Sequence, residues 1–273
     1  MTPDSDETTR TLSTIKTVDF MGLPLADITV DAFSQWMIER ARARRNNTAQ
    51  HKPAFVTYLN AWCTIVAERD EEYRSLIKNC DCLYADGMAV VWAAKLLRTP
   101  IPERVNAGDF IANFLRECAN AKLRIHLIGG KKGVAEKTAR CWTAMIPNLV
   151  ITGYEPGYFD SPEHEARIVQ NIKRVAPDIL LVGMGVPHQE KWTARHIDEI
   201  NCAISWNVGA LFEYFGNKRP RAPIWMRNIG MEWAFRLVLE PKRLCGRYTL
   251  GNIRFIANVI RERMRKSMTA KQN

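Results

Sequence analysis

The sequence predicts an α/β fold, a Rossmann-like parallel sheet flanked by helices, followed by a basic helical C-terminal appendage. Two observations predict it. Short apolar runs alternate six times with stretches of helical spacing, which is typical of a parallel sheet covered by helices on both faces. Past residue 217 the strand-like runs stop, and amphipathic helical segments take their place.

The strands are expected where runs rich in Val, Ile, Leu and aromatic residues end in Gly, Asn or Asp. These runs cover residues 54–59, 82–85, 124–128, 149–152, 178–182 and 203–208. Helical spacing is found between them, over residues 61–79, 87–98, 109–121, 133–145, 162–175 and 188–199. Ahead of the first run, residues 17–45 read as a short strand and a helix that caps the sheet.

Three regions follow from this pattern. Residues 1–16 are polar and are expected to be a disordered tail, 17–217 form the catalytic α/β body, and 218–273 form the appendage. The start of the chain lacks the basic and apolar stretches of a secretory signal, and no run of 18 apolar residues occurs. We therefore expect a cytoplasmic protein without a membrane-spanning helix.

The positive charge is concentrated in the appendage. Residues 218–273 hold 14 Lys or Arg and 3 Glu, a net charge of +11, whereas residues 1–217 carry −1. Such a tail attracts polyanions: nucleic acid, diphosphates or an anionic membrane surface. Its Trp and Phe residues beside Arg are typical of a helix at a membrane interface. A helical flap packed on the body, with solvated charges, explains the pattern equally well.

Several kinds of site are not expected. The seven cysteines are scattered and none forms a CxxC pair, so neither a disulfide framework nor a zinc site is indicated. An Asp-x-Asp pattern, whose carboxylates can hold a metal ion, occurs at Asp4–Asp6, within the expected tail. No P-loop, HExxH or GxSxG motif is found. We expect no metal and no cofactor.

Small and polar residues follow the predicted strands, where parallel α/β sheets bind their ligands. Glycines there let a phosphate or sugar approach backbone N–H groups. The residues concerned are Asn60, Asp86, Gly87, Gly129, Gly130, Gly185, Pro187, Gln189 and Glu190. Gly129-Gly130 is not a complete GxGxxG fingerprint, and no clear ribose-binding acid follows it, so a plain turn is an equal interpretation.

Asp86 has two interpretations. An Asp between a strand and a helix, with Gly beside it, is often a helix N-cap. A carboxylate at the same place could instead take the proton from a hydroxyl group that attacks a substrate. Periodicity alone favours the cap.

The stretch from Ala54 to Arg247 resembles the WecG/TagA/CpsF glycosyltransferase family (glycosyltransferase family 26). About 190 residues carry the resemblance, in order and well separated. The matching segments are Asp86-Gly87-Met88 with Val90 and Val91, Glu103-Arg104-Val105 with Asp109, Gly129-Gly130, Gly153 to Phe159, Pro177 to Gly185 with Pro187, Gln189, Glu190 and Trp192, Arg221-Ala222-Pro223, Glu232-Trp233, Arg236-Leu237 and Glu240-Pro241.

This sequence departs from the family pattern at three places. Ala89 and Ala107 stand where the family usually has Gly, which narrows the space beside the donor or acceptor. The family's Thr-x-Asn is changed, because Thr57 lies three residues before Asn60. Asn60 therefore ranks above Thr57 as a candidate.

The resemblance implies an inverting, metal-independent transfer from a UDP-sugar to an undecaprenyl-diphosphate-linked saccharide in bacterial surface or exopolysaccharide synthesis. Asp86 would be the general base, with Asn60, Thr57 and Arg104 at the reacting sugars. Substrate binding would fall to Gly129, Gly130, Gly185, Pro187, Gln189, Glu190 and Asp109, and to the diphosphate-binding arginines Arg221, Arg236, Arg243 and Arg247.

The same resemblance places the protein peripherally on the cytoplasmic face of the inner membrane, bound to an anionic surface, and leaves open whether it forms a homo-oligomer. The donated sugar stays open between N-acetylmannosamine, its uronic acid and glucose. Two other classes remain: a Rossmann-like oxidoreductase or methyltransferase, and a nucleic-acid-binding protein with a basic tail. The missing glycine fingerprint weighs against the first, and the apolar residues of the tail weigh against the second.

Overall fold

The computed structural model describes residues 14–46, 52–217, 220–248 and 250–269. Its centre is an eight-stranded sheet in the order β1-β2-β4-β3-β8-β7-β5-β6. The first pair is antiparallel and all other neighbours are parallel, so the predicted α/β fold class is confirmed. The strands are β1 Thr17–Phe20, β2 Leu23–Ala26, β3 Ala54–Leu59, β4 Cys82–Ala85, β5 Arg124–Gly129, β6 Val150–Glu155, β7 Ile179–Gly183 and β8 Ile204–Asn207.

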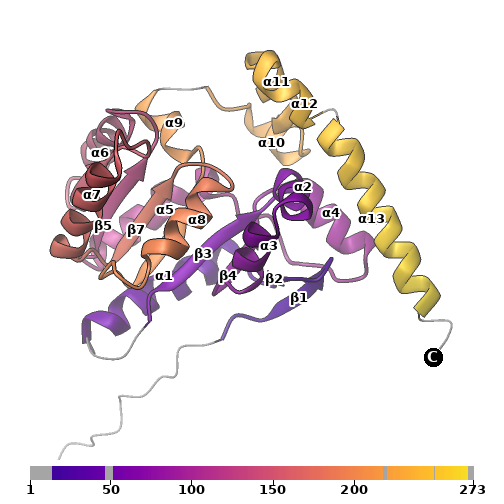
Figure 1. Ribbon diagram of the computed structural model, residues 1–273, viewed down its shortest axis with the longest axis horizontal. Helices are drawn as coiled ribbons and strands as arrows, with labels where there is room; N and C mark the ends of the chain where they lie inside the picture. Colours follow the sequence, from indigo (N-terminus) through magenta and orange to yellow (C-terminus); the bar gives the residue numbers. More distant parts are fainter. Residues whose placement is uncertain (1–13, 47–51, 218–219, 249, 270–273) are drawn as a thin grey trace, which may run out of the picture.

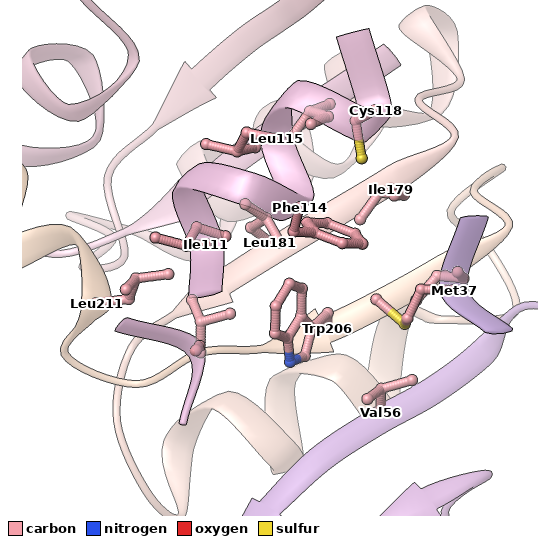
Figure 2. Close-up of a cluster of buried hydrophobic side chains, with 14 of the residues drawn as sticks. Met37, Val56, Ile111, Phe114, Leu115, Cys118, Ile179, Leu181, Trp206 and Leu211 are labelled. Carbon is pink, nitrogen blue, oxygen red and sulfur yellow. The ribbon is translucent and has the colours of Figure 1, made fainter. Parts of the chain in front are cut away.

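One face of the sheet carries the largest part of the core. Trp206 of β8 lies at its centre, fully buried, and Ile179 and Leu181 of β7 point to the same side (Figure 2). Helices α1 (Val30–Asn46), α5 (Ala107–Asn120) and α6 (Val134–Met145) cover this face, with Met37 and Phe114 packed against Trp206. The alternation of side chains along a strand explains why every second strand residue is in this cluster.

The other face is covered in two parts. Helices α2 (Ala61–Arg69), α3 (Glu71–Lys78) and α4 (Met88–Leu96) pack on β3 and β4. Helices α7 (Pro162–Val175) and α8 (His188–His196) pack on β5 and β7, where Leu180 and Val182 point away from the Trp206 side. Buried strands covered on both faces account for the nearly continuous apolar runs in the sequence.

The C-terminal segment folds back over α2 and α4. It follows α9 (Leu211–Gly216) and contains α10 (Ile224–Asn228), α11 (Glu232–Leu239), α12 (Pro241–Tyr248) and α13 (Leu250–Thr269). Figure 1 shows α13, in yellow, running past α4 at the side of the molecule away from β5 and β6. Phe255 and Val259 of α13 are 4% exposed and belong to the same core cluster as Val90 and Ala93 of α4.

Two elements differ from the prediction. Residues 17–45 hold two strands before their helix, because Met21 and Gly22 adopt left-handed backbone angles (φ 55° and 78°) and turn the chain into a hairpin. Residues 61–79 form two helices rather than one. Asp70 ends α2, and its side chain accepts a hydrogen bond from Tyr73 N to begin α3.

Two expectations concern the ends and the membrane. A disordered tail was expected at residues 1–16. Residues 1–13 of this range lie outside the described residues. Among the described helices, none has the length and apolar character needed to cross a bilayer.

Candidate active site

A polar cavity opens at the carboxyl ends of the four central strands, β4, β3, β8 and β7. Its volume is about 230 Å³. The residues that follow these strands line it: Asp86 after β4, Asn60 after β3, Val208 and Ala210 after β8, and Gly185 after β7. The expectation that the rim of the sheet gathers polar and small residues is therefore correct for this part of the rim.

Asp86 is half-buried and does not cap the helix that follows it. The N-cap of α4 is Gly87, and the Asp86 carboxylate instead accepts a hydrogen bond from Asn106 Nδ2 at 2.8 Å. Asn106 is brought there because Val105 N donates to Ala85 O, at the end of β4. The helix-cap interpretation of Asp86 is thus wrong, and its side chain is directed at a polar partner beside the cavity.

Burial raises the pKa of Asp86 to about 6, and it is the largest influence on that carboxyl. The positive charges of Arg236 and Arg104 and hydrogen bonding by Asn60 act in the opposite direction, while the negative charge of Glu232 adds to the rise. A carboxyl with a pKa near 6 is ionised at neutral pH and still basic enough to accept a proton during a reaction. Its environment therefore suits a general base.

Asn60 has a structural role that can be read directly. Its side-chain oxygen accepts hydrogen bonds from the backbone N–H groups of Trp62 and Cys63, which caps α2. This fixes the side chain beside Asp86, where Asn60 lines the polar cavity. Asn60 therefore caps α2 and also forms part of the cavity wall.

A second, larger cavity of about 440 Å³ adjoins the first and is lined mainly by apolar side chains. Its walls come from α2, α4, α11 and α13, and include Trp62, Trp92, Trp233 and Ile256. Five residues line both cavities: Asn60, Trp62, Asp86, Asn106 and Arg236. The Asp86 carboxylate therefore lies where a polar space and an apolar space meet.

The two alanines that depart from the family pattern each line one of these spaces. Ala89 belongs to the wall of the apolar cavity and Ala107 to the wall of the polar cavity. Each methyl group therefore takes space in the cavity that it faces.

A cluster of arginines and carboxylates joins the C-terminal segment to the body. We call it the arginine–carboxylate cluster; its members are Arg104, Asp109, Arg221, Arg227, Glu232 and Arg236. Asp109, in the first turn of α5, pairs with Arg104, Arg221 and Arg227. Two of these arginines come from the C-terminal segment, so Asp109 is an anchor for that segment.

Glu232 is the second carboxylate of the cluster and is 8% exposed. Its carboxylate lies 2.8 Å from Arg236 Nη2 and 3.6 Å from Arg104 Nη1. Arg236 also donates to the Tyr214 hydroxyl, and its guanidinium lies 5.4 Å from the centre of the Tyr214 ring. Arg236 is held in this way on the wall that both cavities share.

The structure places Gln189, Glu190 and Thr57 beneath the rim. All three are fully buried and line neither cavity. Glu190 Oε1 accepts hydrogen bonds from Thr57 Oγ1 and Gln189 Nε2, both at 2.8 Å. Gln189 Oε1 in turn accepts from the backbone N–H groups of Gly185 and Gly209, at 3.2 and 3.0 Å. These side chains fix the loops that line the polar cavity.

Glu190 makes the stability of the protein depend on pH. Burial raises its pKa from 4.5 to about 7, and no described residue hydrogen-bonds to Oε2. Because the fold holds this proton more tightly than the unfolded chain, the stabilisation is complete below pH 4.5 and is lost as the pH rises through 7. In Glu190→Gln this loss, up to about 3 kcal/mol, should be absent.

Urea unfolding at pH 5 and pH 8 measures this effect. The difference in unfolding free energy between the two pH values should be smaller in Glu190→Gln than in the wild type. Glu117→Gln, at an exposed position of α5, is the matched control and should behave like the wild type. An equal pH dependence of the unfolding free energy in all three proteins would show that the ionisation of Glu190 does not destabilise the folded state.

Gly129 and Gly130 serve the packing of the sheet. A Cβ at Gly129 would lie 2.4 Å from Gly183 O, and Gly130 N donates to that same oxygen at 3.0 Å. Neither glycine lines either cavity, nor does Pro187, which is the N-cap residue of α8. Of the expected glycines, Gly185 is the one that lines the polar cavity.

Some residues stay outside this account, and others had not been expected. The side chains of Arg243 and Arg247 lie outside the described part of the structure. Asn106, Tyr214 and Glu232 were not predicted as site residues. Asn106 stands between Arg104 and Asp109 in the sequence and could have been found from them.

Among the described residues, no group of three His, Cys, Asp or Glu is arranged to hold a metal ion.

Fold and site together define an α/β protein with a cavity at the carboxyl edge of a parallel sheet, beside one partly buried carboxylate. A model of the glycosyl transferase WecG/TagA/CpsF family matches residues 18–269. The chain belongs to this family, as the motifs indicated, and is a glycosyltransferase. The oxidoreductase, methyltransferase and nucleic-acid-binding alternatives are therefore not retained.

Individual relatives carry one name, N-acetylglucosaminyldiphosphoundecaprenol N-acetyl-beta-D-mannosaminyltransferase. The protein from Bacillus subtilis (strain 168) is 30% identical over 190 residues, which cover 70% of this chain and 73% of the relative. The protein from Staphylococcus aureus (strain NCTC 8325 / PS 47) is 26% identical over 227 residues, 83% of this chain and 86% of the relative.

Proposed function

We propose that this protein transfers a sugar, with inversion, from a UDP-sugar to a saccharide linked to undecaprenyl diphosphate. One observation supports this best: Asp86 lies at the junction of a polar and an apolar cavity. A transferase that joins a water-borne donor to a lipid-borne acceptor needs one base that both substrates can reach. The names of the relatives agree, because each contains an undecaprenol-linked diphosphosugar.

In the proposed reaction the donor sugar lies in the polar cavity and the acceptor sugar approaches from the apolar side. The acceptor oxygen attacks the anomeric carbon, the bond from that carbon to the diphosphate breaks, and Asp86 takes the hydroxyl proton. The leaving diphosphate then needs positive charge. Arg236, on the wall that both cavities share, would supply this positive charge. The guanidinium of Arg221 lies nearby, 5.3 Å from the centre of the Tyr214 ring.

N-Acetylmannosamine is the first donor sugar to consider, because the relatives are named for it. Its uronic acid and glucose remain alternatives. Surface polysaccharide or cell-wall polymer synthesis is the process that such an acceptor serves. The proposed location is the cytoplasmic face of the cell membrane, where exposed Trp225, Ile253 and Met264 of α10 and α13 would meet the lipid. Self-association is compatible with this arrangement.

The decisive experiment is a transfer assay with purified protein. UDP-linked N-acetylmannosamine, N-acetylmannosaminuronic acid and glucose are each incubated with an N-acetylglucosaminyl-diphosphate lipid. Mass spectrometry identifies the product, and the anomeric coupling constant in its NMR spectrum reports inversion. No product with any donor, together with thermal stabilisation by NAD and not by UDP, would contradict the proposed function.

The proposed base predicts the pH dependence of the reaction. Asp86 must be deprotonated to accept the proton, and its pKa is about 6. The value of kcat/KM is therefore expected to be level above pH 7 and to fall about tenfold per pH unit below 6. Initial rates between pH 4.5 and 8.5 measure this limb. A rate that stays level down to pH 4.5 would exclude a base of this pKa.

A further inference from the structure

The apolar cavity lies on the side from which the acceptor sugar is proposed to approach Asp86. It extends from Asp86 along α4 and α13, between Trp92 and Ile256, and its volume of about 440 Å³ is nearly twice that of the polar cavity. Both of these side chains line the cavity and are more than half exposed, Trp92 at 53% and Ile256 at 56%. Apolar surface of this kind is typical of a binding site for an apolar ligand.

The C-terminal segment closes this cavity at two places. Gly230, with φ of 71°, lets the chain between α10 and α11 approach α4 so closely that a Cβ would lie 2.6 Å from the Trp92 ring. Phe255 and Val259 place α13 in the core cluster that it shares with α2 and α4, and Arg254 of α13 pairs with Glu68 of α2. The cavity is therefore a product of the folded appendage, and its walls are held on both sides.

Charge is distributed along the cavity in an order that matches one kind of ligand. Asp86 and Asn106 stand where the two cavities meet, Arg104 and Arg236 line the wall beside them, and the rest of the lining is mainly apolar. A polyprenyl diphosphosugar has the same order: hydroxyl groups, then two phosphates, then branched hydrocarbon. The bond between sugar and diphosphate is short, so a sugar hydroxyl at Asp86 brings the acceptor phosphates near Arg104 and the first isoprene units to the apolar walls, while Arg236 serves the leaving diphosphate of the donor.

We propose that the apolar cavity holds the isoprenoid units next to the diphosphate of the lipid-linked acceptor. This rests on the proposed function, which it deepens by adding the hydrocarbon to the groups that the site recognises. An undecaprenyl chain is much longer than the cavity, so the remaining units stay in the bilayer. Ala89, on the wall, helps to set the width available to the first units.

Soluble acceptors separate this cavity from membrane binding. One acceptor is N-acetylglucosaminyl diphosphate esterified with a methyl group, and the other carries a farnesyl group, both below their micelle concentrations. The wild type is expected to use the farnesyl acceptor with a kcat/KM at least about tenfold higher, since the cavity buries apolar surface of the chain. Ile256→Glu and Trp92→Ala should lose that advantage and keep their rate with the methyl acceptor.

Ile253→Glu is the matched control. Ile253 lies on the same helix and is 67% exposed, but it does not line the cavity. It should keep the full advantage of the farnesyl acceptor. If Ile253→Glu and Ile256→Glu lose it equally, or if the wild type has no such advantage, the cavity does not bind the chain. If Ile253→Glu and Ile256→Glu have a lower kcat/KM than the wild type only when the acceptor is embedded in vesicles, Ile253 and Ile256 contact the bilayer instead.

Calorimetric titration with farnesyl diphosphate needs no turnover and therefore separates the two proposals. Binding by the wild type that Ile256→Glu and Trp92→Ala weaken at least about tenfold, and Ile253→Glu does not, supports the cavity even if every transfer assay fails. Transfer to the methyl acceptor without any binding of farnesyl diphosphate would support the enzyme and overturn the cavity. Circular dichroism confirms that each variant is folded.

Discussion

Replacement of Asp86 by Asn is expected to lower kcat about a hundred- to ten-thousand-fold, which is the range of a lost general base. The amide keeps nearly the shape of the carboxylate and can still accept the hydrogen bond from Asn106 Nδ2, so the local structure should persist. It cannot take a proton from the acceptor hydroxyl. The binding of the donor, measured by calorimetry with UDP, should change little.

The control for this variant is Asp160→Asn, because Asp160 has a side chain that is 96% exposed. Both variants lose one negative charge, so a general charge effect would appear in both. Near-normal turnover by a folded Asp86→Asn protein would remove Asp86 from the proposed mechanism. The loss of the acidic limb of the pH profile in the residual activity would add independent support.

Ending the chain after Asn217 is expected to leave a folded body with transfer lowered about a hundredfold or more. The shortened protein lacks Arg236, which lines both cavities, and Arg221, which lies beside the Tyr214 ring on the polar cavity. It also lacks α13, whose Phe255 and Val259 complete a core cluster on α4, so its melting temperature should be lower. The assay uses the methyl acceptor, which needs no membrane. Full activity would show that the C-terminal segment has no part in the chemistry.

A single substitution tests the same idea without exposing the core. Arg236→Ala should lower kcat by about a hundredfold or more, since it removes a charge that stabilises the leaving group. Arg236→Lys should recover part of the loss, because it restores the charge without the two-pronged geometry. Arg265→Ala, on an exposed part of α13, should have the activity of the wild type.

Most of the fold could be predicted from local patterns. Strand β3 was expected at 54–59 and found there, since its apolar run is bounded by Pro53 on one side and Asn60 on the other. The hairpin of β1 and β2 was missed because its turn depends on two left-handed residues, one of which is Met21 rather than Gly. The break between α2 and α3 was missed because the apolar spacing continues through Asp70.

The site was harder to predict, because its parts come from distant segments. Asp86 could be found from its place after a strand. The contact of Arg104 with Glu232 joins segments far apart in the sequence, and no local pattern predicts it. Gln189 and Glu190 also show the limit: their place after a strand predicts contact with a ligand, yet their side chains turn inward and bind the loops. Side-chain direction is decided by packing that the sequence pattern does not contain.

The arginine–carboxylate cluster divides the positive charge of the C-terminal segment into two populations. Arg221, Arg227 and Arg236 form ion pairs and are at most 34% exposed, whereas Arg261 of α13 is exposed and Arg265 forms its ion pair with Glu262 on the exposed surface of that helix. Dissolved ions screen exposed charges strongly and enclosed pairs much less. Rising ionic strength should therefore weaken the proposed attachment to an anionic membrane surface well before it disturbs the ion pairs beside the proposed catalytic centre. On this proposal the protein leaves the membrane in an assembled state and returns to it without refolding.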